Sequence, residues 1–390
     1  MRVRELTAWQ VRVPLKKPIQ HASHTRAETD NIVVRCRLDD GTTGYGEGVP
    51  REYVTGETVD SAVQLLAHSD LPAQLEACAS FADAVRLAER VVLAPVPGDE
   101  RGCGGNSARC ALELALLDAY GQHFREPLSA VTRLLAPELF EPRSHVRYSG
   151  AITSAQGRKV RFQAWKYWFY GFHQLKVKVG IEGQDDVDRL GAIRRRVGRK
   201  VDLRVDANEA WAPAEVCARI IELKPFGISA VEQPVAHADS RVLGGVRRAT
   251  GVPIMLDESL CSMTDAEQAA AAGTCDLFNL RMSKCGGYIG TLRLAQFAHT
   301  HGLGYQLGCQ VGETAILSAA GRHFASSVRD IRYVEGSYDR HLVREALGRI
   351  DLTFGWGGWA PALPGPGLGV AIDPERLERI AVRKEVLLGG

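Results

Sequence analysis

The chain has 390 residues, of which 45% are hydrophobic and 24% charged, and its formal net charge is +2. A chain of this length buries a large core and typically forms two domains. No segment approaches the roughly 20 apolar residues of a membrane span, and the balanced charge disfavours a nucleic-acid partner. The nine cysteines include no Cys-x-x-Cys pair, which favours a reducing cytoplasm and disfavours a zinc site or disulfide framework.

Residues 1–140 are predicted to form an α+β domain. Residues 2–14 and 31–38 read as strands, and Asp39-Asp40-Gly41 is a hairpin turn signal. Residues 107–120 carry apolar side chains at helical spacing, and Gly121 is predicted to end that helix. Strands and helices are therefore mixed here without a regular order.

A regular alternation of strand-like and helical segments follows over residues 141–355. The strand-like runs are 146–152, 174–179, 202–207, 228–233, 253–258, 277–282, 304–309 and 331–336. Crossovers of this length predict parallel neighbours, and hence a barrel. An open doubly wound sheet is the competing arrangement, but no Gly-x-Gly-x-x-Gly follows a strand to support nucleotide binding. Residues 356–390 begin rich in Gly, Pro and Trp, and we expect them to return toward the first domain.

Three acidic residues end successive strand-like runs. Asp206, Glu232 and Asp257 are separated by 26 and then 25 residues, about one strand-plus-helix unit. The ends of successive barrel strands meet at one rim, so the three carboxylates should converge and would repel one another without a cation. Oxygen ligands of this kind suit Mg²⁺.

Two lysines lie on the second predicted barrel strand. Lys176 and Lys178 are two residues apart, so both side chains point to the same side of the strand. If that side is the barrel interior, burial and mutual repulsion should lower the pKa of one amine and make it a base near neutral pH. If it is the outside, both are ordinary solvated lysines. The neighbouring carboxylates favour the interior.

An ordered set of motifs closely resembles the enolase superfamily, muconate-lactonizing subgroup (the mandelate racemase/muconate lactonizing enzyme family). The motifs are LKVKVG (175–180), VDANEAW (205–211), VEQP (231–234), LDES (256–259) and NLRMSKCGG (279–287), while 43–58 and 106–121 resemble the family's capping domain. The resemblance implies a modified (β/α)₇β barrel of the TIM type with an N-terminal α+β cap. It also implies a homo-oligomer, a dimer or octamer, and removal of a proton alpha to a carboxylate of a small substrate, assisted by Mg²⁺ or by Mn²⁺.

The resemblance also assigns roles at the rim. Asp206, Glu232 and Asp257 would be metal ligands. Lys178 would be the base, and Lys176 would tune it and hold the substrate carboxylate. Asn208 and Glu258 are candidates to support these groups from behind, although Asn208 has the alternative of simply ending its strand.

The sixth strand departs from the family pattern. Where the family has its second lysine this chain has Arg281, and Lys284 follows three residues later. An arginine does not readily give up a proton, so it suits a fixed cation better than a base. Lys284 has two interpretations, a substitute base or a lysine of the following loop.

The last two strands also differ from the pattern. Dipeptide epimerases of the subgroup carry Asp-x-Asp on the eighth strand, where this chain has Glu335-Gly336-Ser337. Glu335 is a candidate to meet a substrate amine. Glu313 follows the seventh strand, and it either faces the site or caps the next helix.

Two loops of the cap are expected to cover the barrel mouth if the resemblance holds. His24, Arg51, Tyr53 and Thr55 are the candidates for substrate contacts. Arg51 together with Arg281 would suit a substrate with more than one anionic group.

Three functional hypotheses follow from these residues. The first is one-base chemistry by Lys178, either cycloisomerisation of the muconate-lactonizing type or syn elimination of water, which we place first because of Arg281. The second is an amino-acid or dipeptide racemase or epimerase with Lys284 as second base. The third is a non-catalytic binding protein on the same scaffold.

Overall fold

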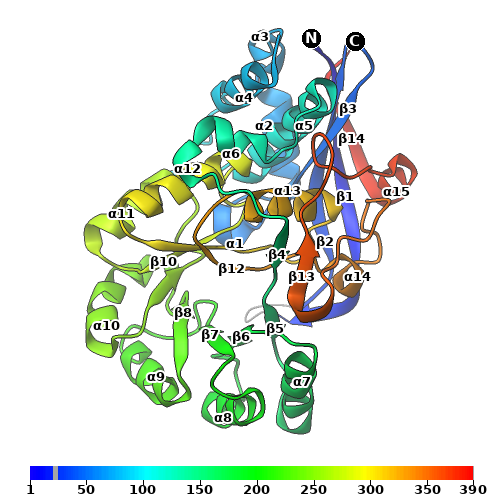
Figure 1. The fold of residues 1–390 in the computed structure, drawn as a ribbon. Helices are drawn as coiled ribbons and strands as arrows, with labels where there is room; N and C mark the ends of the chain where they lie inside the picture. The colour runs from blue at the N-terminus through cyan, green and yellow to red at the C-terminus, as the bar shows by residue number, and fades with distance from the viewer. Residues whose placement is uncertain (21–24, 390) are drawn as a thin grey trace.

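The computed structural model describes residues 1–20 and 25–389 of the chain. A four-stranded antiparallel sheet with strand order β14-β1-β2-β3 lies at one end of the molecule. Its strands are β1 (Val3–Gln20), β2 (Thr25–Leu38), β3 (Thr43–Gly48) and β14 (Ala381–Leu388). Figure 1 shows the red strand β14 beside the blue strand β1, with the two chain ends close together. The end of the chain therefore completes the sheet that its beginning starts.

Local sequence explains the hairpin between β2 and β3. The Leu38 N–H donates a 2.8 Å hydrogen bond to the Thr42 carbonyl, and Gly41 adopts a φ of +87°, which suits glycine. The strands β2 and β3 leave and enter this turn at residues 38 and 43. The hairpin predicted from Asp39-Asp40-Gly41 is thus confirmed.

Helices cover one face of this sheet. They are α1 (Glu52–Thr55), α2 (Val59–His68), α3 (Leu71–Gln74), α4 (Phe81–Arg90), α5 (Asn106–Phe124) and α6 (Ala130–Leu135). The long helix α5 lies directly on β3, where a side chain at Gly46 would come within 2.0 Å of the Ala111 carbonyl oxygen. Alternate glycines in β3 therefore allow the close approach.

The predicted end of α5 is wrong. Gly121 lies inside the helix, which continues to Phe124 and ends at Arg125 with a φ of 59°. The small size of Gly121 instead admits the C-terminal segment, because a side chain there would lie 2.8 Å from the Gly367 Cα. This glycine serves packing rather than helix termination.

Eight parallel strands form the second sheet, in the order β12-β11-β10-β9-β8-β7-β6-β5. They are β5 (Gly150–Ile152), β6 (Gln174–Lys178), β7 (Asp202–Asp206), β8 (Ile228–Glu232), β9 (Ile254–Leu256), β10 (Leu277–Leu280), β11 (Gly304–Leu307) and β12 (Ile331–Val334). Each falls within one of the eight predicted runs. The predicted α/β architecture, a barrel-like parallel sheet with an α+β cap, is confirmed.

Helices connect these strands in sequence. They are α7 (Gly157–Phe169), α8 (Asp186–Val197), α9 (Val216–Leu223), α10 (Leu243–Thr250), α11 (Met263–Ala272), α12 (Gly287–Thr300) and α13 (Ala315–Ala325), with two further short helices, α14 (Asp339–Leu342) and α15 (Pro374–Ile380). Figure 1 shows α7 to α11 as an outer layer beside the green strands, whereas α14 and α15 lie next to β1 of the first sheet. In the part of the chain that the structure describes, none of the helices could cross a membrane.

The first predicted barrel run, 146–152, splits into two strands. Residues His145–Arg147 form β4, which pairs with β13 (Trp359–Pro361), and only Gly150–Ile152 joins the parallel sheet. Between them the Ser149 N–H donates a 2.8 Å hydrogen bond to the Val334 carbonyl at the end of β12. This contact brings the first and last strands of the parallel sheet together and curls it.

Buried hydrogen bonds join the cap to the barrel. Glu47 on β3 is fully buried and accepts from the Thr314 N–H at 3.1 Å and the Thr314 hydroxyl at 2.8 Å, next to the start of α13. Asn31 on β2 donates to Glu47 at 2.7 Å and to the Gly312 carbonyl at 2.9 Å. The cap is therefore held over the carboxyl ends of the barrel strands.

Candidate active site

Strand register places the key side chains in one row. Lys178 on β6 is paired with Asp206 on β7, and Asp206 is paired with Glu232 on β8. Asp257 follows β9 immediately. The carboxylates of Asp206, Glu232 and Asp257 are at most 1% exposed, so the predicted convergence brings buried acidic groups to one rim.

Lys176 lies among the carboxylates rather than on the outer surface. Its side chain is 9% exposed, and its Nζ lies 2.8 Å from Glu335, 3.3 Å from Asp206 and 3.5 Å from Glu232. Glu335 also forms an ion pair with the fully buried Arg204. Lys176 and Arg204 thus occupy both oxygens of Glu335, which we had predicted to meet a substrate amine.

These contacts set the direction of several pKa shifts. Burial opposes the charge of Lys176, but Glu232, Glu335 and Asp206 outweigh it and raise the pKa of Lys176 well above its usual value. Burial likewise opposes the charge of Glu335, but Lys176 and Arg204 lower the pKa of Glu335 to about 2. The lowered pKa expected for one of the two lysines is therefore not found at Lys176, because this amine is surrounded by carboxylates.

Lys178 has a more accessible position and a different partner. The side chain is half-buried, and Nζ donates a 2.7 Å hydrogen bond to the Asn208 side-chain oxygen. Asn208 donates in turn to Glu258 at 3.4 Å. Asn208 and Glu209 both have positive φ values, 44° and 66°, just after β7. This turn aims Asn208 at the amine, so its role goes beyond ending the strand.

Arg281 links two of the carboxylates. Its guanidinium forms an ion pair with Asp257 and lies 3.6 Å from Glu232, and its side chain is 11% exposed. The strand β10, which Arg281 follows directly, lies four places from β6 in the sheet order. In a curled eight-stranded sheet, four places correspond to the opposite side. Arg281 therefore faces the site from across the barrel relative to Lys178.

Lys284 is neither a solvated loop lysine nor open to the barrel mouth. Its side chain is fully buried, with Nζ 3.1 Å from an Asp257 carboxylate oxygen. The same amine donates to the backbone carbonyls of Asp257 and Leu260, at 2.5 Å and 2.6 Å. These bonds tie Lys284 to the loop after β9, which makes it a support for Asp257.

Within the described residues, no three His, Cys, Asp or Glu side chains are arranged as ligands around one ion. Lys176 and Arg281 instead lie between the carboxylates. One buried oxygen of Glu232 nevertheless has neither a hydrogen-bond nor an ion-pair partner in the described part of the chain, and the corresponding oxygens of Asp206 and Asp257 face only the amines of Lys176 and Lys284. Burial and the nearby Asp206 charge also raise the pKa of Glu232 to about 8, a direction that a bound cation would reverse. The donor chemistry therefore fits a hard divalent cation such as Mg²⁺.

The predicted cap contacts divide into three cases. Arg51 is buried, and it donates to Thr29 at 2.7 Å and to the Val311 carbonyl at 2.6 Å, which makes it a tie between cap and barrel. Tyr53 is 41% exposed, and both it and Thr55 line a cleft beside α1. His24 lies outside the described residues.

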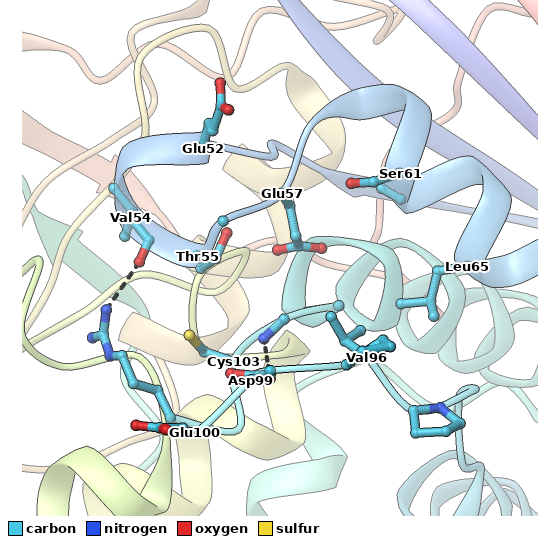
Figure 2. A pocket seen from close by; sticks show the side chains of 18 of the residues that line it. Glu52, Val54, Thr55, Glu57, Ser61, Leu65, Val96, Asp99, Glu100 and Cys103 are labelled. Atoms are coloured by element: carbon cyan, nitrogen blue, oxygen red, sulfur yellow. Dashed lines mark hydrogen bonds between the residues drawn. The ribbon is translucent and has the colours of Figure 1, made fainter.

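That cleft is large but does not contain the carboxylate row. It has a volume of about 900 Å³ and lies between helices α1 and α2 and the segment 94–105, with His237 at its edge. Figure 2 shows its lining residues, among them Glu57, Asp99 and Cys103. The cleft approaches the barrel rim through Arg101, which donates to the Glu258 carbonyl at 2.9 Å.

Glu313 borders the barrel interior and also the end of a loop. Its carboxylate accepts a 2.6 Å hydrogen bond from the Gln310 N–H, while Thr314 is the residue that precedes α13. Glu313 and Glu335 line the same small internal cavity. Burial raises the pKa of Glu313 to about 8. Glu313 therefore closes its own loop instead of capping the helix.

Sequence reasoning missed two polar residues that hold the acidic groups. Asn279 on β10 is fully buried and donates to Glu232 at 2.7 Å. Gln233 accepts from the Asp257 N–H at 3.0 Å and has a φ of 36°. The signal for Asn279 was available, because it lies two residues before Arg281 and so shares its side of the strand. Gln233 carried no comparable signal.

Two family descriptions match this chain. "Mandelate racemase / muconate lactonizing enzyme, N-terminal domain" matches residues 3–132, and "Enolase C-terminal domain-like" matches residues 159–376. The second match alone covers more than half of the chain. The order of the matches agrees with the cap followed by the parallel sheet.

Similar proteins include racemases and epimerases. The chain is 28% identical to an N-succinyl-L-Arg/Lys racemase of Bacillus cereus, over 99% of this chain and 100% of that protein. It is 30% identical to an L-Ala-D/L-Glu epimerase of Bacillus subtilis, over 95% of this chain and 97% of that protein. These names agree with our racemase or epimerase alternative better than with our first hypothesis.

Solved structures give the same picture. The N-succinyl Arg/Lys racemase from Bacillus cereus superimposes with a TM-score of 0.86 and 26% identity, covering 99% of this chain and 100% of that one. The dipeptide epimerase from Cytophaga hutchinsonii, complexed with Mg and the dipeptide D-Ala-L-Val, gives a TM-score of 0.83 and 25% identity with the same coverage. The similarity spans both the cap and the barrel.

Proposed function

Because this chain belongs to the mandelate racemase/muconate lactonizing enzyme family of the enolase superfamily, we propose that Lys178 removes a proton from the carbon alpha to a substrate carboxylate. The observation that carries the proposal is the row formed by Lys178, Asp206 and Glu232 on three adjacent strands. The row places an amine, held by Asn208, beside acidic oxygens that suit a divalent cation. Nothing in barrel packing requires these buried charges, which cost desolvation. This cost argues against the non-catalytic alternative.

The roles of the remaining residues follow from their contacts. Asp206, Glu232 and Asp257 would hold Mg²⁺, with Mn²⁺ as a substitute, and the cation would supply stabilisation of the negative charge that develops on the substrate carboxylate. Lys176, which already holds Asp206 and Glu335, would bind the same carboxylate. Asn208 orients Lys178, and Glu258 supports Asn208.

For the substrate we propose an N-acylated amino acid or a dipeptide. Support comes from the relatives, named for N-succinyl-L-Arg/Lys and for L-Ala-D/L-Glu, whose full length this chain covers almost completely. Tyr53 and Thr55 are our candidates for side-chain selection, and His24, which lies outside the described residues, stays a prediction from the sequence. Arg51 would act indirectly, by fixing the cap over the barrel.

The reaction of the enediolate depends on which side chain lies on the face of the site opposite Lys178. Arg281 is there, held by Asp257, and a guanidinium does not exchange protons at neutral pH. Lys284 is fixed to two backbone carbonyls behind Asp257. We therefore favour one-face chemistry, by cycloisomerisation or by elimination from an acylated amino acid that carries a leaving group on its β-carbon, with Arg281 as a fixed cation that stabilises the developing charge.

Racemisation or epimerisation is the second candidate. The names of the relatives favour it. It requires a proton donor on the face opposite Lys178, because inversion delivers the proton to the side from which it did not leave. Both candidates share the first step at Lys178 and differ only in the second.

The test is exchange of the α-proton in D₂O, followed by proton NMR, with Mg²⁺, both enantiomers of N-succinyl-lysine and N-succinyl-arginine, and both epimers of L-Ala-D/L-Glu. We expect exchange in the native chain and a loss of roughly 10²–10⁴-fold in Lys178→Ala. The matched control is Lys166→Ala on the exposed side of α7, which should leave the rate unchanged.

The outcomes separate the candidates. Exchange from one enantiomer only supports one-face chemistry, whereas exchange from both supports the racemase or epimerase. A folded Lys178→Ala variant with the native exchange rate would contradict the assigned base. We also propose an oligomer, which ultracentrifugation would check, and a cytoplasmic location, which cell fractionation would check. The proposed domain boundaries at residues 140 and 355 can be checked by limited proteolysis.

A further inference from the structure

Two cysteines from distant parts of the chain meet where the cap contacts the barrel. Cys103 precedes α5 in the cap, and Cys261 lies in the loop between β9 and α11. Their side chains pack against each other and Val54, with exposures of 4% and 0%. The Cys261 thiol also donates to the Glu258 carbonyl at 3.7 Å. Neither cysteine belongs to the carboxylate row or to the lysines of the proposed mechanism.

Ion pairs and hydrogen bonds hold the two segments in place around this pair. Arg101 donates to the Val54 carbonyl at 3.1 Å and to the Glu258 carbonyl at 2.9 Å, and it forms a 2.8 Å ion pair with Asp265. Asp265 also accepts a 2.8 Å hydrogen bond from the Cys261 N–H. The contacts of Arg101 and Asp265 therefore hold the two segments together and keep the two thiols next to each other.

A second tie comes from the start of α5. Asn106 donates from its side-chain nitrogen to the Cys261 carbonyl at 2.8 Å and to the Lys284 carbonyl at 2.6 Å. Asn106 lies three residues after Cys103, so its hydrogen bond to Cys261 holds the segment that carries Cys103 against the loop that carries Cys261. Such preorganisation favours formation of a bond between the two sulfurs.

One of the two sulfurs is within reach of a small molecule. Cys103 lines the cleft of about 900 Å³ described above, whereas Cys261 lies behind it. Figure 2 shows the Cys103 sulfur facing α1, with Val54 and Thr55 across from it and Asp99 nearby. The neighbouring Cys103 thiol and the cations Lys284 and Arg101 lower the pKa of Cys261, which favours its thiolate, whereas Cys261 and burial raise the pKa of Cys103.

We propose that Cys103 and Cys261 form an oxidisable dithiol site, which a small-molecule disulfide entering the cleft converts into a covalent link between cap and barrel. Cys103 first forms a mixed disulfide with one half of the reagent, releasing the other half as a thiol. Cys261 then attacks the Cys103 sulfur and releases the second half. One S–S bond breaks and one forms, and the two protons and two electrons of the cysteines leave with the reagent's two thiols.

The experiment treats the full-length reduced protein with oxidised glutathione and maps its peptides without reduction. We expect a crosslinked peptide pair containing Cys103 and Cys261, a mass loss of about 2 Da and a decrease from nine free thiols to seven. Dithiothreitol should restore all of them. Because the map uses the unmutated chain and no turnover assay, its result is independent of the proposed function.

Variants test the order of the two steps. Cys261→Ser should accumulate a glutathione adduct on Cys103, while Cys103→Ser should form no adduct at Cys261. The control Cys275→Ser, at a buried cysteine two residues before β10, should crosslink as the native chain does. A native peptide map with both cysteines still reduced, or with either paired to a different cysteine, would overturn the proposal.

Discussion

The amine of Lys178 donates a 2.7 Å hydrogen bond to Asn208, and Asn208 donates in turn to Glu258 at 3.4 Å. These two hydrogen bonds connect the end of β6 to the loops after β7 and β9. Asn208 holds its position through a φ of 44° and a 3.1 Å hydrogen bond from its own N–H to Asp206. One amide side chain therefore fixes the orientation of the proposed base relative to the carboxylate row.

Asn208→Ala should slow exchange of the substrate α-proton by about 10²-fold, because an amine without its acceptor no longer holds the reactive geometry. The effect should fall mainly on kcat, measured in initial rates of exchange in D₂O. Asn208→Asp keeps an oxygen at the same place and should recover most of the rate. An alanine variant with native thermal stability and a native rate would show that Lys178 is oriented by something else.

Arg281→Lys should add exchange from the enantiomer that the native chain leaves untouched. The substitution keeps a cation near Asp257 and Glu232 and supplies an amine, which can exchange a proton where a guanidinium cannot. NMR of both enantiomers in D₂O measures this directly. Arg281→Gln, which has neither charge nor basicity, is the matched control. Equal exchange from both enantiomers in the unmutated chain would contradict our one-face preference.

Mg²⁺ should stabilise the protein through Asp206, Glu232 and Asp257. At a concentration 100 times its dissociation constant it adds about 2.7 kcal/mol to the free energy of unfolding. Unfolding by urea in Mg²⁺ and in EDTA should therefore differ for the native chain and agree closely for Asp206→Asn.

The matched control for that experiment is Asp202→Asn, at the other end of the same strand β7. It removes a carboxylate of equal size that lies away from the row, so its Mg²⁺ response should remain native. Identical Mg²⁺ responses in the native chain and in Asp206→Asn would remove the ion from our assignment.

The contribution of His323 to stability should fall as the pH is lowered from about 6.5 to about 4, whereas buried acids such as Glu313, whose pKa is raised to about 8, contribute in the opposite direction. Burial lowers the pKa of His323 from 6.5 to about 4, although its hydrogen bond to the Leu368 carbonyl acts the other way. Between these values the unfolded chain binds a proton that the folded chain does not, so folding is disfavoured by on the order of 3 kcal/mol at the acid end. Urea unfolding at several pH values measures the slope.

His323→Gln should remove this part of the pH dependence, since glutamine does not titrate. The matched control is His301→Gln at the exposed end of α12, which should keep the native slope. The same slope in the native chain and in His323→Gln would mean that His323 does not contribute to the pH dependence.

Much of the fold could be predicted because its signals are local. The strands of the parallel sheet are short apolar runs, and the turn at Gly41 is a property of three consecutive residues. Helix ends were harder, as Gly121 shows. A glycine needed for close packing against Gly367 carries the same letter as one that ends a helix.

The site likewise contains residues that local sequence predicts and residues whose roles depend on distant partners. Carboxylates at the ends of successive strands could be recognised from spacing alone, because parallel strands deliver their ends to one rim. The roles of Lys284, Glu335 and Arg51 could not. Each is a charged residue whose partners, Asp257, Lys176 and the Val311 carbonyl among them, come from other elements.

The amino-acid sequence by itself thus determined the alternation of strands and helices, the acidic row and the family. These depend on the order and spacing of residues along one strand or turn. Tertiary structure alone decided which charges neutralise one another, that Lys176 is held among carboxylates, and that Cys103 meets Cys261. The physical reason is that charge pairing and thiol contact act over a few ångströms in space, and only the closed barrel and its cap set those distances.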